Sequence, residues 1–180
     1  EAIEFYERAI TQRKAPNIAT ACRSYAIFLR SIKRDMKKSE RLFRRALFIE
    51  PNSCENMFEL AHHLIICKKD TCEAIKLCKN VLELEPSHVD ALTSLASLLA
   101  QRKGAKKKEE AMGYFNRACR LQGDNIDVIL AYATFLDYEI NDILRAKIYY
   151  EKAIALNKDN PMVVAAFASF TDHKIGNGIE

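Results

Sequence analysis

The sequence lacks tryptophan and has few residues that interrupt helices, with five glycines and four prolines among 180 residues. Because glycine and proline mark turns and end helices, their scarcity favours a helical protein with short connections. No apolar run approaches the roughly 20 residues that a transmembrane helix needs, although 49% of the residues are hydrophobic. We therefore expect a helical protein that does not insert into a membrane.

Motifs of the common enzyme classes are missing as well. The chain contains no P-loop, no GxGxxG sequence, no HExxH sequence and no serine in a nucleophile-elbow sequence. We therefore expect a protein that is not an enzyme and that needs no cofactor.

Charges of both signs are mixed, with 28 lysines and arginines against 24 acidic residues and a net charge of +4. This mild excess does not by itself indicate nucleic-acid binding. The six cysteines have no regular spacing, and a chain of this length does not need disulfide bonds to fold. We interpret them as reduced thiols of an intracellular protein, in the cytoplasm, with the nucleus and the cytoskeleton as alternatives.

A six-residue pattern returns five times, as SYAIFL, ELAHHL, SLASLL, AYATFL and AFASFT. In every copy a bulky apolar residue is followed by alanine, and the pairs are Tyr25-Ala26, Leu60-Ala61, Leu95-Ala96, Tyr132-Ala133 and Phe167-Ala168. Successive pairs are 35, 35, 37 and 35 residues apart. A constant period in this range indicates a stacked repeat array.

A second pattern alternates with the first and combines small and aromatic residues. Its first small residues are Ala2, Ser39, Ala74, Ala111 and Ala146. Four residues later stand Tyr6, Phe43, Cys78, Phe115 and Tyr150, and three further stand Ala9, Ala46, Val81, Ala118 and Ala153. Residues four and three apart share one helix face, so each segment is predicted to be an amphipathic helix whose small residues allow a second helix to approach.

The repeat unit is therefore a helix A, which holds the six-residue pattern, a short polar turn, and a helix B. Helix B is predicted to end at Lys14, Pro51, Pro86, Gly123 and Lys158. The next helix A is predicted to start at Asn17, Ser53, Ser87, Asn125 and Asn160, while Asp35, Asp70 and Asn141 or Asp142 are predicted to cap helix B.

These boundaries divide the chain into a single array over residues 1–180. The predicted segments are helix B of a preceding repeat (1–14), four repeats (17–51, 53–86, 88–123 and 125–158), and helix A with the turn of a following repeat (160–180). Because the chain begins and ends at the same phase, we expect it to be a segment of a longer chain.

The two patterns together resemble the tetratricopeptide repeat (TPR). The matching features are the bulky-alanine pair in helix A, the small-aromatic-small series in helix B, and the closing prolines Pro51 and Pro86. The resemblance implies an all-α fold, a right-handed α-solenoid of stacked antiparallel helix pairs with about ten helices. Tryptophan, frequent in helix A of the family, is replaced here by Cys22, Met57, Leu92, Ile129 and Val164.

The resemblance also implies a function, a protein-interaction scaffold whose A helices line a concave groove for a partner peptide or helix. The helix A stripe beside the buried one is predicted to face this groove. Its members are Arg23, Ile27, Arg30, Phe58, His62, Thr93, Ser97, Leu130, Thr134 and Asp137. We expect charge reversal at Arg23 and Arg30, or a bulky residue at Ser97, to weaken partner binding without lowering the melting temperature.

One TPR subclass, which clamps the carboxylate tail of chaperones, is not expected. The places that need lysine, arginine or asparagine hold Arg23 and Ile27, then Glu59, then Asp90 and Ser94. Most of the required side chains are therefore missing.

A second surface is predicted along the turns between helices A and B, which are rich in basic residues. We name it the basic turn edge, and its members are Lys33, Arg34, Lys37, Lys38, Lys68, Lys69, Lys106, Lys107 and Lys108. Such an edge suits RNA, and YAxF resembles half-a-TPR repeats of RNA-processing scaffolds. Nucleic acid is thus an alternative partner, and a purely architectural role in a large assembly or on a cytoskeletal filament is another.

Potential metal ligands gather in one part of the sequence, namely His62, His63, Cys67, Cys72 and Cys78. His63 and Cys67 are four residues apart, a spacing that lets two ligands share a metal on one helix face. Cys78, however, takes the aromatic position of helix B, where a free cysteine acts as a small hydrophobe. The sequence therefore favours no metal site.

Overall fold

Helices account for almost all of the regular structure in the computed structural model, which describes residues 1–11, 17–68 and 70–175, with backbone only for 173–175. The helices of the first half are α1 (Ala2–Thr11), α2 (Ile18–Phe28), η1 (Leu29–Lys33), α3 (Met36–Ile49), α4 (Cys54–Ile66) and α5 (Thr71–Leu84). Those of the second half are α6 (Val89–Ala100), α7 (Ala105–Leu121), α8 (Ile126–Thr134), η2 (Phe135–Ile140), α9 (Ile143–Leu156) and α10 (Pro161–Ile175).

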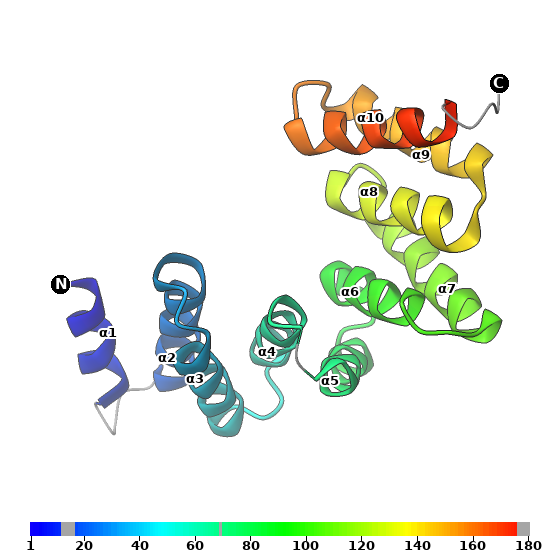
Figure 1. The fold of residues 1–180 in the computed structure, drawn as a ribbon. Coiled ribbons are helices and arrows are strands. Elements are labelled where there is room, and N and C mark those ends of the chain that lie inside the picture. Colours follow the sequence, from blue (N-terminus) through cyan, green and yellow to red (C-terminus); the bar gives the residue numbers. More distant parts are fainter. Residues whose placement is uncertain (12–16, 69, 176–180) are drawn as a thin grey trace. The chain divides into compact units, whose positions relative to one another are not determined.

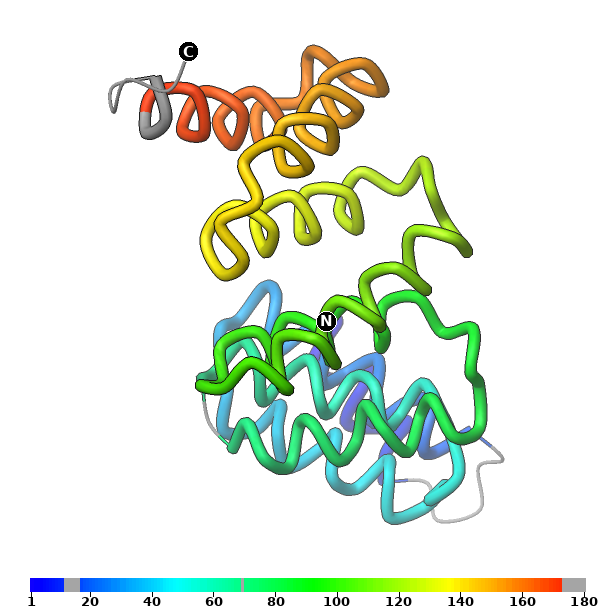
Figure 2. Tube along the Cα trace, turned by 90° about the vertical axis from the view of Figure 1, so that its right-hand side faces the viewer, coloured from blue at the N-terminus to red at the C-terminus, as the bar shows by residue number. Residues whose placement is uncertain are grey.

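The helices pack as antiparallel pairs of an A helix and a B helix (Figure 1). The pairs are α2 with α3, α4 with α5, α6 with α7, and α8 with α9. In Figure 2 the orange-to-red trace of α10 lies beside that of α9, in agreement with their contacts. The predicted all-α class of ten helices in stacked pairs is confirmed over the described residues.

The chain divides into two compact units, Glu1–Pro86 and Ser87–Glu180. The division falls where one predicted repeat ends and the next begins. Unit 1 holds two complete helix pairs preceded by α1, and unit 2 holds two complete pairs followed by α10. The placement of all residues in one array remains a prediction.

The core of each helix pair lies where the two repeated patterns meet. The alanines of helix A at 26, 61, 96 and 133 are fully buried, and so are the small residues of helix B at 39, 74, 111 and 146. Phe43, Cys78, Phe115 and Tyr150 are 0–2% exposed and fill the space between them. The small residues predicted at the contact between helices A and B are therefore confirmed in these four pairs, whereas Ala2 of α1 and Ala168 of α10 are exposed. A larger residue at the buried positions would separate the two backbones.

The helix starts follow the predicted capping positions with one exception, although Asn17 before α2 makes no side-chain capping bond. Ser53, Asn125, Asp35, Asp70 and Asp142 each accept a hydrogen bond from a backbone N–H of the first helical turn. Each bond satisfies a donor that the helix itself leaves open.

The exception is Ser87, where the predicted helix start is wrong by one residue. His88 caps α6 instead, since its Nδ1 accepts the N–H of Ala91 at 3.2 Å. An imidazole nitrogen, and not the predicted serine hydroxyl, thus caps this helix.

Two A helices end in a π-helical segment that the sequence did not predict. η1 follows α2 and η2 follows α8, and each ends at a residue with left-handed backbone, Arg34 (φ 56°) and Asn141 (φ 59°). The two repeats concerned are those that contain Tyr-Ala-x-Phe-Leu. A π-helical turn has a wider hydrogen-bond spacing than an α-helix, so side chains within it lie at rotated positions.

Candidate functional site

Two arginines predicted to face the groove instead connect consecutive A helices inside unit 1. Arg23 of α2 donates to Asn56 Oδ1 of α4 at 2.9 Å, and Arg30 of η1 pairs with Glu59 Oε2 of α4 at 2.8 Å. The Arg30 side chain is 9% exposed, and its guanidinium carbon lies 5.1 Å from the centre of the Phe43 ring. Arg30 is therefore a packing residue, and its charge reversal is expected to lower stability, contrary to the sequence-based expectation.

The remaining predicted groove residues of unit 1 form a partly exposed aromatic and aliphatic surface. Phe58 and His62 stack on α4 with ring centres 6.0 Å apart and an interplanar angle of 12°. Ile27 of α2 is also partly exposed. This surface is therefore partly accessible to a partner.

The predicted groove residues of unit 2 separate into accessible and buried members. Thr93 and Ser97 of α6 are partly exposed, and Thr134 of α8 is exposed. Leu130 is 9% exposed and Asp137 is 2% exposed, so neither side chain offers a surface to a partner. Asp137 lies in η2, where the π-helical geometry turns it toward the interior, and its negative charge adds to the burial that raises the pKa of Tyr150.

Two of the accessible residues, Ser97 and Thr134, line one hollow between α6 and α8, with a volume of about 310 Å³. We name it the α6–α8 hollow. Its lining residues are Ser97, Ala100, Gln101, Phe115, Ala131, Thr134, Phe135, Tyr138 and Glu139. The hollow is therefore built from the A helices of two consecutive repeats, with the aromatic ring of one helix B at its base.

The lining of the α6–α8 hollow combines an apolar wall with a polar rim. Phe115 and Phe135 are buried against each other with ring centres 5.1 Å apart. Ala100 and Ala131 keep the space open because their side chains are short. Thr134 donates to the carbonyl of Leu130 at 2.8 Å, and Glu139 pairs with Lys108 at 3.0 Å. An apolar group with polar surroundings fits such a lining.

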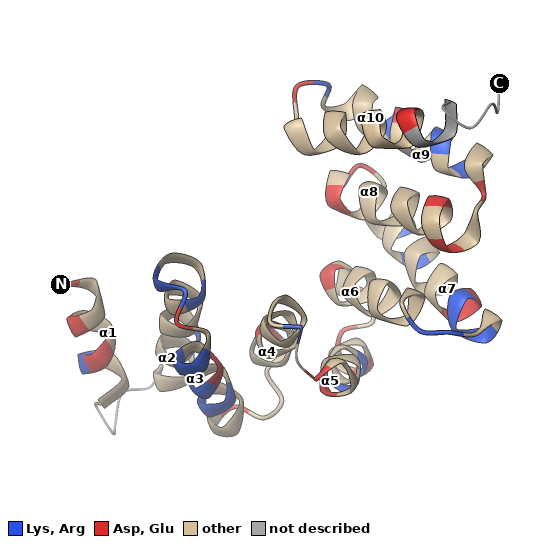
Figure 3. Cartoon of the chain, viewed as in Figure 1, with Lys and Arg blue, Asp and Glu red and all other residues tan. Residues whose placement is uncertain are grey.

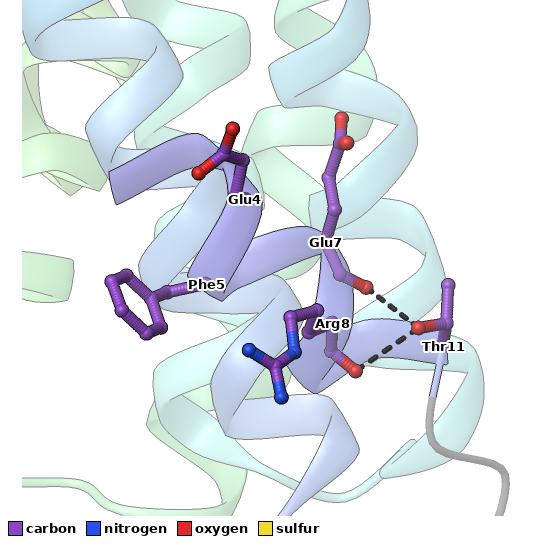
Figure 4. A pocket seen from close by; sticks show the side chains of 5 residues that line it. All are labelled: Glu4, Phe5, Glu7, Arg8 and Thr11. Carbon is purple, nitrogen blue, oxygen red and sulfur yellow. Dashed lines mark hydrogen bonds between the residues drawn. The ribbon is translucent and has the colours of Figure 1, made fainter. Parts of the chain in front are cut away.

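A second hollow lies on α1 and is lined by Glu4, Phe5, Glu7, Arg8 and Thr11 (Figure 4). All five residues belong to this one helix, so the hollow has a single wall. The Thr11 hydroxyl is held by the carbonyl oxygens of Glu7 and Arg8 at 2.9 and 3.0 Å. Because no second described element contributes to its lining, we do not treat it as a candidate binding site.

Several residues of the basic turn edge lie in helices and form ion pairs, so the edge is less basic than its sequence indicates. Lys37 and Lys38 lie in the first turn of α3, and Lys106, Lys107 and Lys108 lie in the first turn of α7 (Figure 3). Lys38 pairs with Glu7 at 2.9 Å, Lys107 with Glu110 at 2.9 Å, and Lys108 with Glu139. Three of its charges are thus compensated.

The other members of the basic turn edge differ in position and exposure. Lys33 ends η1, and Arg34 and Lys68 have left-handed backbone with φ of 56° and 48°. These three side chains and Lys106 are exposed. Lys69 lies outside the described residues.

In the part of the chain that the structure describes, one histidine and one cysteine of this group lie close together, and they belong to no larger cluster of metal-ligating residues. No group of three or more metal-ligating side chains is found there. His63 Nε2 lies 3.4 Å from Cys67 Sγ, while Cys78 is fully buried in the helix B core. No described helix is long and apolar enough to cross a membrane.

The repeat geometry agrees with a family model and with solved structures. The model described as tetratricopeptide repeat matches residues 136–160, which hold the end of the fourth helix A and its helix B. This segment therefore matches one tetratricopeptide repeat. A thermophilic TPR protein of Thermus thermophilus has a TM-score of 0.75 at 18% identity, over 89% of this chain and 83% of that one.

Two further solved structures match nearly all of the chain. YrrB, described as a TPR protein with an unusual peptide-binding site, has a TM-score of 0.66 at 14% identity over 96% of this chain and 85% of its own. PilF of Pseudomonas aeruginosa has a TM-score of 0.75 at 20% identity, over 95% and 74%. At these identities the likeness establishes the fold.

The remaining comparisons do not assign an activity to this chain. An O-GlcNAc transferase of Thermobaculum terrenum matches over 26% of its own length with a TM-score of 0.67 and 20% identity. TPR scaffolds are generally non-catalytic. No curated protein matches the chain significantly. The half-a-TPR interpretation gains no support from these matches.

Proposed function

We propose that this chain is a non-catalytic protein-interaction module, and that the α6–α8 hollow receives an apolar side chain from a peptide or helix of a partner protein. The observation that carries the proposal is that Ser97 and Thr134, chosen from the repeat pattern as groove positions, both line a hollow. TPR proteins typically mediate protein–protein interactions, and YrrB carries a peptide-binding site.

The size and lining of the α6–α8 hollow define what fits. About 310 Å³ is at the small end of ligand pockets, so it suits one bulky side chain more than a whole small molecule. Phe115, Phe135 and the two alanines favour an aliphatic or aromatic group. Gln101 and Tyr138, which also line the hollow, carry polar groups that can form hydrogen bonds to the backbone beside that group.

Selection of peptides tests the proposal because it does not require the natural partner to be known. The chain is immobilised and a phage-displayed library of random short peptides is selected against it. The selected peptides are expected to share one bulky apolar residue. Ser97→Tyr places a phenol ring in the hollow and is expected to weaken their binding at least about tenfold, or about 1.4 kcal/mol.

The matched control adds the same ring elsewhere. Lys147 lies on the exposed side of α9, with a side chain that is 59% exposed, so Lys147→Tyr leaves the hollow unchanged. It is expected to retain wild-type affinity. Failure to enrich any peptide, or equal affinity of the wild type and Ser97→Tyr, would contradict the proposal.

A further inference from the structure

Three polar side chains form a row through the interior of unit 1, apart from the α6–α8 hollow. Ser39 of α3 lies 3.4 Å from His63 Nδ1, and His63 Nε2 lies 3.4 Å from Cys67 Sγ. Ser39 and His63 are fully buried, whereas Cys67, which directly follows α4, is partly exposed. The row therefore runs from the core to the surface.

The direction of the hydrogen bonds follows from the single proton of the Ser39 hydroxyl. Ser39 Oγ donates to the carbonyl of Ala26 at 2.8 Å, so toward His63 it acts as an acceptor. The His63 Nδ1 must then carry the proton, and a neutral imidazole leaves Nε2 as the acceptor. Cys67 consequently donates its thiol proton to His63 Nε2.

The other cysteines provide an internal comparison. Burial raises the pKa of Cys22, Cys54 and Cys119, and raises that of Cys78 to about 12. The thiolate is the reactive form, so these four thiols are protected at neutral pH. Cys72 is more exposed than Cys67 and would be modified first if exposure alone decided.

We propose that Cys67 is a base-assisted reactive thiol and a modification site for electrophiles of the α,β-unsaturated carbonyl class. A nucleophile, a base within hydrogen-bond reach and a third group that orients the base make up the arrangement that activates thiols. Here Cys67 is the nucleophile, His63 the base and Ser39 the orienting group.

The reaction conserves atoms and needs no oxidant. The thiol proton passes to His63 Nε2 while the sulfur forms a bond to the β-carbon of the electrophile. The electron pair of the carbon–carbon double bond moves to the α-carbon, which takes a proton back. The product is a thioether, His63 returns to its neutral form, and no group leaves. The developing imidazolium is stabilised by Ser39 Oγ and by the sulfur anion beside it.

Residues at the equivalent positions of other repeats suggest substitutions that remove the hydrogen bonds of the row and suit the same helix packing. The position of Ser39 is held by Ala74, Ala111 and Ala146 in the other B helices, so Ser39→Ala restores the residue used there. The position of His63 corresponds to Leu98 of α6, which is 5% exposed, so His63→Leu places a side chain that this core site accepts.

The test is a short pulse of substoichiometric N-ethylmaleimide on the folded chain, followed by measurement of the modified fraction of each cysteine by peptide mass spectrometry. Cys67 is expected to react at least about tenfold faster than the more exposed Cys72, since a positioned base accelerates proton transfer by more than that. Both variants are expected to slow Cys67 several-fold and to leave the rate at Cys72 unchanged.

Two results would overturn the proposal. One is a rate at Cys72 equal to or above that at Cys67 in the wild-type chain, a comparison that needs no variant to fold. The other is an unchanged rate at Cys67 in Ser39→Ala and His63→Leu, provided that circular dichroism shows native helix content.

Discussion

Some predicted groove residues of the A helices contact neighbouring helices, and others remain accessible. The sequence pattern does not fully distinguish the two groups. Arg30 and Asp137 belong to the predicted groove stripe, yet Asp137 is buried and the Arg30 side chain is only 9% exposed. Both lie in π-helical segments, η1 and η2, where an angle of 100° per residue no longer holds. The alanine and aromatic positions of the four complete helix pairs, by contrast, are buried as predicted, whereas Ala2 of α1 and Ala168 of α10 are exposed.

Arg30 provides the first prediction at the residue scale. Arg30→Met removes one partner of a largely buried ion pair and leaves Glu59 uncompensated, so the free energy of unfolding is expected to fall by about 2 kcal/mol. Arg41→Met is the control, because Arg41 is exposed and is expected to change stability by less than about 0.5 kcal/mol. Urea unfolding of both variants gives the comparison, and equal stabilities would refute the packing role of Arg30.

At the scale of the element, helix α7 contains one glycine in its interior and one at its start. Gly113 is exposed with open space around its Cα, so Gly113→Ala is expected to raise the free energy of unfolding by about 0.5–1 kcal/mol. Gly104 has φ of 116°, a conformation that strains other residues, so Gly104→Ala is expected to lower it by about 1 kcal/mol. Thermal unfolding measures both, and shifts of the same sign would contradict the account.

The attachment of α1 to α2 and α3 is expected to depend on pH. The Lys38 ammonium, which donates to Glu7 Oε1 at 2.9 Å, lowers the pKa of Glu7, and the Tyr25 hydroxyl adds to this. A carboxyl group whose pKa is lower in the folded state stabilises that state above its unfolded pKa. This stabilisation is lost as the pH falls through the lowered value.

Lys38→Met should remove this part of the pH dependence, whereas Lys37→Met, beside it on an exposed position, should retain it. The measurement is the melting temperature of both variants and the wild type between about pH 6 and about pH 3. A steeper acid loss in Lys38→Met than in Lys37→Met would show that the Glu7–Lys38 pair does not carry the effect.

At the scale of the whole molecule, the fold followed from the sequence because its determinants are local and repeated. Small residues at fixed spacing, capping residues and closing prolines are each visible in one repeat, and recurrence makes them specific. The α6–α8 hollow was predictable only in part. Ser97 and Thr134 follow from the stripe, but Gln101 lies directly after α6, and Tyr138 and Glu139 lie in η2. The repeat pattern does not predict the position of these three side chains.

The central claim, that the α6–α8 hollow binds the apolar side chain of a partner, is tested most directly by amide NMR. A peptide selected against the chain is titrated into ¹⁵N-labelled protein, and the backbone shifts are mapped. The account predicts that the largest shifts cluster at Ser97, Ala131, Thr134 and Tyr138. Shifts centred instead on Lys33, Arg34 and Lys37, with the hollow unaffected, would contradict it.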